Sequence, residues 1–155
     1  MTKSDLFSFL ALSLSTALAQ MSKQCHFVGF SDGTASRPVS YTGKCSQDGT
    51  DICSQLDLSH CLTNQDGYLS PPVDANFEGF KMSCPSCHVE QQGRKLFCIC
   101  QRADRSFNYT WVDLDGIISV REGLLTCSTT IGQKIAECPV TRIGQPPNRR
   151  VAFVA

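Results

Sequence analysis

The sequence lacks the excess of charge and the metal-ligand patterns that would select several common kinds of partner. Its 155 residues contain 14 Lys and Arg against 14 Asp and Glu, so no basic field is available for nucleic acid or for an acidic membrane. The three histidines, His26, His60 and His88, have no metal-ligand spacing. Glutamate is scarce, and no pair of carboxylates stands out for glycosidase chemistry. We therefore expect no nucleic-acid or membrane partner, no cofactor and no catalysis.

Long apolar runs are also missing, apart from one at the N-terminus. It extends from Leu6 to Leu18 after Lys3 and is followed by the small residue Ala19. A membrane-spanning helix needs about 20 apolar residues. A shorter run after a basic residue is typical of a secretory signal peptide. We predict that residues 1–19 are such a peptide and that the mature chain is secreted.

The mature chain also lacks a sustained 3.6-residue apolar period, which argues against long helices. Short alternating segments are instead separated by turn residues, which is typical of an all-β domain. We predict one such domain over residues 20–127. Residues 128–155 carry three prolines and a basic pair at Arg149 and Arg150. They are predicted to form a C-terminal extension that is partly disordered.

One stretch of the sequence occurs twice. Residues 56–69 align without a gap with residues 112–125, an offset of 112 − 56 = 56 residues. Each copy has an apolar-Asp-Leu segment, followed by an acidic residue and a glycine. A repeat of this length indicates one supersecondary unit used twice. The two repeats are predicted to span about 25–70 and 76–127.

Each copy is predicted to form a strand, a tight turn and a second strand. The alternation of apolar residues with Asp assigns Leu58 and Leu114 to the first strand of their copies. We expect Asp57 and Asp113 to play the same role in each half, accepting backbone hydrogen bonds at the bend that follows the strand.

Ten cysteines follow the predicted signal peptide, which indicates a disulfide framework in an exported chain. In a hairpin, opposed residues have a constant sum of residue numbers, and candidate pairs can be found by this rule. The rule predicts three bridges, namely Cys25–Cys45, Cys84–Cys100 and Cys87–Cys98. The last two pairs differ by one in their sums, which a β-bulge at Pro85-Ser86 accommodates. The pairing of the other four cysteines stays open.

The Cys84-Pro85-Ser86-Cys87 segment is also compatible with two other uses. Its two cysteines could hold zinc as thiolates together with Cys98 and Cys100. A C-x-x-C motif could also be a thiol-redox centre, but that chemistry needs the start of a helix in a βαβ unit. Export and the strand-rich context favour structural disulfides over both.

The doubled segment, each copy after a cysteine-bounded hairpin, resembles the cyanovirin-N homology domain, and the extra inner cysteines resemble its filamentous-fungal branch. The resemblance covers about Cys25 to Cys127. It implies an all-β fold of two pseudo-symmetric, interleaved modules, each with a three-stranded sheet and a β-hairpin. It also implies binding of mannose-type glycans, in shallow pockets and without catalysis.

The same resemblance implies which residues would contact a glycan. The positions that match the family pocket in this sequence are Asn64, Asp66, Asn76, Ser83, Arg102 and Arg105. The second pocket has Val120 where the first has Asn64, and Val120 has no hydrogen-bonding side chain. We therefore expect at most one working pocket and a monomeric protein.

Each of these assignments has a simpler alternative. Turn chemistry alone would explain Asn64 and Asp66, and Arg102 with Arg105 would suit a solvated hairpin face. The only tryptophan, Trp111, is predicted to lie in the core. On the alternative reading, the chain is a secreted interaction module that binds another protein and has lost its sugar sites.

One acceptor sequence for N-glycosylation occurs, at Asn108-Tyr109-Thr110. We predict glycosylation of Asn108, with that residue in an exposed turn.

Overall fold

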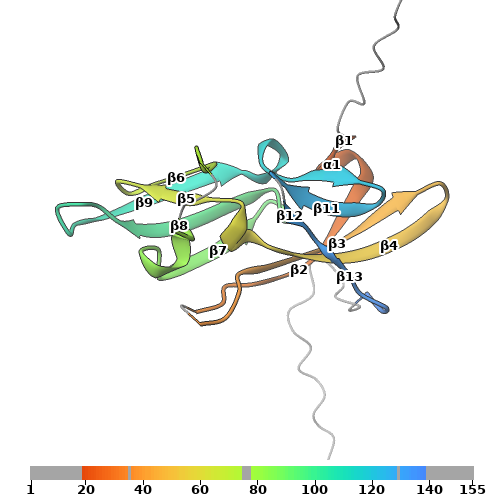
Figure 1. Cartoon of the computed structure of the whole chain (residues 1–155), viewed down its shortest axis with the longest axis horizontal. Coiled ribbons are helices and arrows are strands. Elements are labelled where there is room, and N and C mark those ends of the chain that lie inside the picture. Colours follow the sequence, from red (N-terminus) through yellow and green to blue (C-terminus); the bar gives the residue numbers. More distant parts are fainter. Residues whose placement is uncertain (1–18, 35, 75–77, 129, 139–155) are drawn as a thin grey trace, which may run out of the picture.

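A computed structural model describes residues 19–34, 36–74, 78–128 and 130–138 (Figure 1). The predicted signal peptide, apart from Ala19, and the end of the C-terminal extension lie outside these residues. No helix within the described ranges is both long and apolar enough to cross a membrane.

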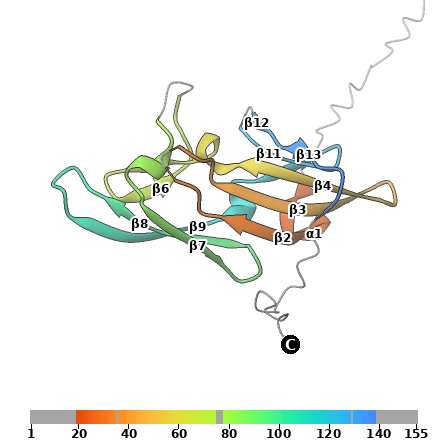
Figure 2. The same ribbon diagram turned by 90° about the horizontal axis from the view of Figure 1, so that it is seen from below.

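The first repeat supplies one antiparallel sheet. Its strands are β2 (Cys25–Ser31), β3 (Ser40–Gln47) and β4 (Thr50–Asp57). The second repeat supplies the equivalent sheet. Its strands are β7 (Ser86–Glu90), β8 (Lys95–Gln101) and β9 (Phe107–Asp113). Figure 2 shows the two sheets next to one another along the long axis of the molecule.

Each repeat also supplies a short hairpin, which packs on the sheet of the other repeat. The first hairpin consists of β5 (Thr63–Gln65) and β6 (Tyr68–Ser70), and the second of β10 (Ser119–Arg121) and β11 (Leu124–Cys127). Strand β6 lies beside β9 and β8, and β11 lies beside β4 and β3. The predicted all-β fold of two interleaved modules is therefore confirmed.

Two matched hydrogen bonds hold the exchanged hairpins. The amide of Leu69 donates to Oγ1 of Thr110 at 3.3 Å, and the amide of Leu125 donates to Oγ of Ser54 at 3.0 Å. The two donors are 56 residues apart (125 − 69), and so are the two acceptors (110 − 54). The sequence repeat is thus also a repeat of contacts between the modules.

A 3-10 turn follows β4 and β9, and here the strand prediction for Leu58 and Leu114 is wrong. These residues begin η1 (Leu58–His60) and η3 (Leu114–Gly116), and both are fully buried. A single 3-10 turn and a strand can bury the same short apolar pattern, so alternation alone could not separate them. A third 3-10 turn, η2 (Phe80–Met82), precedes the second-repeat sheet.

The prediction for the two aspartates is confirmed. Oδ1 of Asp57 accepts the amide of Ser59, and Oδ1 of Asp113 accepts the amide of Asp115, both at 2.9 Å. Each carboxylate caps the first turn after its strand, where backbone amides have no intrahelical partner.

Asp57→Ala and Asp113→Ala are each expected to lower the free energy of unfolding by about 1 kcal/mol, because each removes a capping acceptor. Urea unfolding of the oxidised protein measures both losses. Losses of only a few tenths at both sites would show that the caps are not structural.

The cysteine framework agrees with the predicted pairs. All three predicted bridges are present, with Cα–Cα distances of 3.9, 4.0 and 4.2 Å. The remaining four cysteines form Cys53–Cys138 and Cys61–Cys127. All ten are oxidised, which removes the zinc and thiol-redox alternatives. The residue that shifts the register, Pro85, lies just before β7 rather than within the strand.

Short segments at both ends extend the two modules. They are β1 (Ala19–Gln20), α1 (Met21–Gln24), β12 (Thr130–Ile131) and β13 (Gln133–Lys134). Strands β1 and β12 flank the β10–β11 hairpin, and β13 pairs with β4. The first part of the C-terminal extension is therefore attached to the fold by strand pairing and by Cys138.

Candidate functional site

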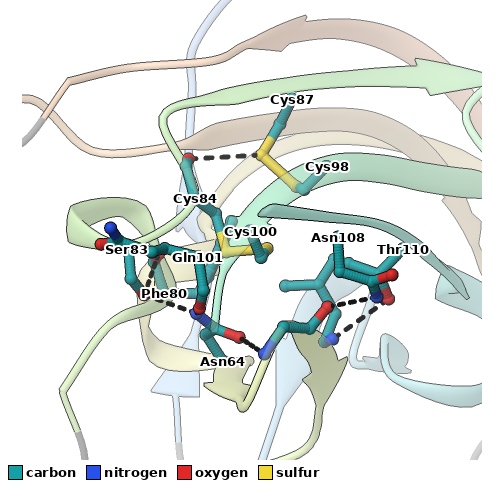
Figure 3. Close-up of a disulfide and its surroundings, with 12 residues drawn as sticks. Asn64, Phe80, Ser83, Cys84, Cys87, Cys98, Cys100, Gln101, Asn108 and Thr110 are labelled. Atoms are coloured by element: carbon teal, nitrogen blue, oxygen red, sulfur yellow. Dashed lines mark hydrogen bonds between the residues drawn. A yellow bond between two sulfur atoms is a disulfide. The ribbon is translucent and has the colours of Figure 1, made fainter. Parts of the chain in front are cut away.

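The residues predicted to form a pocket gather around the turn between β5 and β6. Figure 3 shows Asn64 of β5 with its side chain directed toward Ser83 and Gln101. Its Nδ2 donates to Oγ of Ser83 and to the carbonyl of Gln101, each at 2.9 Å. Its Oδ1 accepts the amide of Gly67 at 2.8 Å. Asn64 thus uses its donors to join the turn to the end of β8 and to Ser83, which follows η2, so it positions the other groups.

Asp66 holds the turn to the segment after β8. One carboxylate oxygen accepts the amide of Ala103 at 2.9 Å, and the side chain is exposed. Asp66 itself has φ 48°, in the left-handed region that Asp tolerates. A carboxylate held in this way leaves oxygen lone pairs directed at solvent, which suits a ligand rich in hydroxyls.

Arg102 lies on the other side of the turn. Its Nη2 donates to Oδ1 of Asn108 at 2.9 Å, and its Cζ is 5.8 Å from the centre of the Tyr68 ring. Nε of Arg102 is buried and has no hydrogen-bond partner among the described residues. Arg105 is exposed in the same loop, where its amide donates to the carbonyl of Arg102.

The loop that carries the two arginines also carries a stabilised carboxylate. Hydrogen bonds from the Ser106 side chain and backbone hold the pKa of Asp104 below its usual value. Asp104 is negative at neutral pH, as an aspartate ordinarily is, and the lowered pKa keeps that charge beside the arginines at more acidic pH as well.

The structure thus brings together Asn64, Asp66, Ser83 and Arg102, with Arg105 in the adjoining loop. Asn76 lies outside the described residues, and its role stays a prediction. Sequence reasoning missed Tyr68, whose ring is 58% exposed beside Arg102. The position of Tyr68 directly after the Asp66-Gly67 turn was the feature of the sequence that could have placed it in this group.

Asn108 has a different place from the one predicted. It lies in β9, half-buried, and not in an exposed turn. Its Nδ2 donates to the carbonyl of Gly67 at 2.8 Å, and its Oδ1 accepts from Arg102. Asn108 therefore supports the β5–β6 turn. Its glycosylation stays a prediction, and attachment of a glycan would use the nitrogen that bonds Gly67.

Gly67 is required by the close approach of its neighbours. Its φ is 89°, and a Cβ added to it would lie 2.7 Å from Cγ of Arg102 and 2.9 Å from Cβ of Asn108. Gly49 also has a positive φ, of 79°, but a Cβ there would meet nothing within 4 Å. A side chain at Gly49 would therefore meet backbone strain alone, whereas one at Gly67 would meet both strain and steric collision.

Gly49→Ala is expected to cost about 1–2 kcal/mol of stability, from backbone strain alone. Gly67→Ala should cost more, because the added methyl group also pushes Arg102 and Asn108 apart. Thermal unfolding of the two variants measures the difference. Equal losses would mean that the groups around Gly67 are not tightly packed.

The equivalent turn of the second repeat has the same backbone but different side chains. Glu122 and Gly123 have φ values of 52° and 79°, close to those of Asp66 and Gly67. At the offset of 56 residues, the buried Val120 takes the position of Asn64, and Ile52 takes the position of Asn108. A Cβ on Gly123 would lie 2.7 Å from Cδ1 of Ile52. An apolar contact therefore replaces the hydrogen-bonded one.

The sequence model of the CVNH domain matches residues 21–126, more than half of the chain. The chain belongs to the CVNH domain family. No curated protein sequence matches it significantly.

Solved structures share the fold of this CVNH domain at low identity. The microvirin:mannobiose complex has a TM-score of 0.57 and 23% identity, covering 72% of this chain and 100% of microvirin. The MoCVNH3 variant (Mo0v) in complex with (N-GlcNAc)4 has a TM-score of 0.57 and 15% identity, covering 72% and 99%. The CVNH protein of Gibberella zeae has a TM-score of 0.56 and 20% identity, covering 70% and 96%.

The single tryptophan of this CVNH domain is not in the core, so that prediction is wrong. Trp111 is 52% exposed on β9. Its strand pairs Thr110 with Cys98, which points Thr110 inward and Trp111 outward. The core is instead built from aliphatic residues, cystines, Tyr41 and Phe80.

Proposed function

We propose that this CVNH domain is a secreted lectin that binds mannose-type glycans without catalysis, through one pocket at the β5–β6 turn. The observation that carries the proposal is the group formed by Asn64, Asp66, Ser83 and Arg102, in which hydrogen bonds hold each side chain in place around the β5–β6 turn. It fixes a carboxylate and a guanidinium beside an exposed tyrosine ring. Such a mixture of acceptors, donors and an aromatic face suits the paired hydroxyls of a sugar.

The asymmetry of the two repeats supports a single pocket. The second turn keeps its backbone but has Val120 and Ile52 in place of the two asparagines. A single shallow pocket with a few hydrogen bonds, each worth roughly 0.5–1.5 kcal/mol, supports binding in the millimolar to micromolar range. A monomer with one pocket gains no avidity by bridging two arms of a glycan.

Two further observations are consistent with this role. Microvirin is a CVNH-fold protein solved with mannobiose, and the MoCVNH3 variant was solved with a GlcNAc oligomer. All ten cysteines of this chain are in disulfides, which persist in oxidising compartments such as the extracellular space.

The test is the titration of two matched variants with mannobiose, followed by NMR. Asp66→Ala removes the exposed carboxylate of the first turn and is expected to weaken binding at least tenfold. Glu122→Ala makes the equivalent change in the second turn and should leave affinity unchanged. Asn64→Ala, checked for folding, should abolish binding because it releases the turn from β8.

Equal affinity of the two matched variants would contradict the proposed pocket. Absence of binding by the unmutated protein would favour the interaction module, a protein-binding use of the same scaffold.

A further inference from the structure

The outward face of the β7–β8–β9 sheet carries a continuous row of aromatic side chains. Phe107, Tyr109 and Trp111 alternate along β9 and are 58%, 57% and 52% exposed. Strand β8 adds Phe97, which lies opposite Trp111, and Ile99, which lies opposite Tyr109. Soluble proteins rarely leave so large an apolar patch in water unless it binds something.

The rings of this aromatic face form a stack across the strands. The centre of the Phe97 ring lies 5.3 Å from that of His88 and 5.7 Å from that of Tyr109, with interplanar angles of 10° and 21°. Trp111 is 6.4 Å from Phe97, and Nζ of Lys95 lies 4.2 Å from the Trp111 ring centre. The contacts hold the rings in fixed orientations, so little side-chain entropy is lost on binding.

Charge on this face is confined to one row at its end. Glu90, Lys95 and Asp113 are neighbours in the register of the three strands. The guanidinium of Arg94 lies 3.5 Å from the Asp113 carboxylate, so two acids meet two bases and this row has little net charge. Binding of single-stranded nucleic acid joins aromatic stacking to a positively charged groove, which this row does not provide. An anionic lipid surface likewise needs an excess of basic residues. A neutral ligand fits the charge of the face.

The length of the row favours an extended ligand. Alternate residues of a strand are about 6.7 Å apart, so three aromatic rings along β9 cover roughly 13 Å, the scale of a short run of sugar rings. Polar residues, Ser86 and Gln101, lie on the same face beside the rings. They can bond hydroxyls at the edge of a chain whose flat ring faces lie on the aromatics.

We propose that this aromatic face is a second glycan-binding surface, which takes an extended, neutral, β-linked polysaccharide such as chitin or cellulose. It lies on the exposed side of β8 and β9, separate from the turn between β5 and β6. The surface does not require the pocket proposed above, and the two can be tested apart.

The test compares retention of the oxidised mature protein on insoluble chitin and on insoluble cellulose. The double variant Tyr109→Ser with Trp111→Ser is expected to be retained at least tenfold less than the unmutated protein on the polysaccharide that binds. Ile131→Ser is the matched control, because Ile131 is 50% exposed on β12, and its retention should not change. Mass spectrometry should find five disulfides in every variant.

Trp111 also gives a direct readout, because it is the only tryptophan. Adding a soluble chitin or cellulose hexasaccharide should change its fluorescence, whereas mannobiose should not. The double variant and the unmutated protein should have the same affinity for mannobiose. Loss of retention on the polymer with unchanged mannobiose binding would show that the two surfaces act separately.

Three results would overturn the proposal. The first is no retention of the unmutated protein on either polymer. The second is equal retention of the double variant. The third is a double variant that changes only the sedimentation coefficient, from dimer to monomer, which would assign the face to self-association.

Discussion

Replacing Cys61 and Cys127 together by alanine is expected to lower the free energy of unfolding by about 4 kcal/mol, from loop entropy alone. The bridge closes 66 residues and joins the η1–β5 junction to the end of β11, so it ties the two repeats together. Both cysteines are buried in the common core. This is a large share of the stability of a small domain, which is typically about 5–15 kcal/mol.

The pair Cys87 and Cys98 gives the matched comparison. This bridge closes only 11 residues within one hairpin, and its removal should cost about 3 kcal/mol by the same relation. Guanidinium unfolding of both double variants measures the order of the two losses. A smaller loss at Cys61 and Cys127 would mean that the modules are held together by packing and not by the bridge.

Leu58→Ala and Leu114→Ala are each expected to cost about 2–5 kcal/mol, because each leaves a cavity in a close-packed core. The two leucines are fully buried and begin the equivalent 3-10 turns of the two repeats. Their amides donate to Val39 and Arg94 carbonyls at 2.8 and 2.7 Å. Similar environments should give similar losses.

Urea unfolding of the two leucine variants, with exposed Val73→Ala as a control, checks this equivalence. Val73 is 85% exposed and should change stability by no more than about 0.5 kcal/mol. A loss under 1 kcal/mol at one leucine and a large loss at the other would contradict the structural repeat.

Three of the five disulfides and the repeat could be predicted because they follow from counting along the chain. The interleaving of the two modules was implied by the resemblance to the cyanovirin-N homology domain. A hairpin fixes which cysteines face one another, and the repeat fixes that Asp57 and Asp113 share a role. Cys53–Cys138 and Cys61–Cys127 could not be predicted in this way. Cys61–Cys127 joins segments that approach through the exchange of hairpins between modules, and Cys53–Cys138 depends on the pairing of β13 with β4. No local pattern reports either contact.

The predictions for Leu58, Leu114 and Trp111 are wrong because a short apolar pattern does not determine the backbone conformation or the direction of a side chain. Leu58 and Leu114 lie in buried 3-10 turns, and such a turn shows the same alternation of apolar and polar residues as a strand. The residue type of Trp111 favours the core, but the register of β9 against β8 directs its side chain to solvent, because Thr110 pairs with the buried Cys98. That register depends on the length of the loop 102–106, which the sequence left undetermined.

At the candidate site the structure places four of the predicted residues together, and their role as glycan ligands stays a prediction. Asn64 was expected to be a ligand, but its amide is engaged in the hydrogen bonds that build the turn. Turn chemistry therefore accounts for the contacts of Asn64, and in the proposed function the sugar contacts fall to its neighbours. The asparagine forms the turn, and the turn presents Asp66 and Tyr68.

The most direct test of a single glycan pocket is an amide-shift map of the oxidised, unmutated protein during titration with mannobiose. The amides of Gly67 and Ala103 bond Asn64 and Asp66, so both should move as the sugar binds. The amide of Gly123, in the equivalent turn, should stay in place. Shifts of equal size at Gly67 and Gly123, or none at Gly67 and Ala103 at millimolar sugar, would contradict the account.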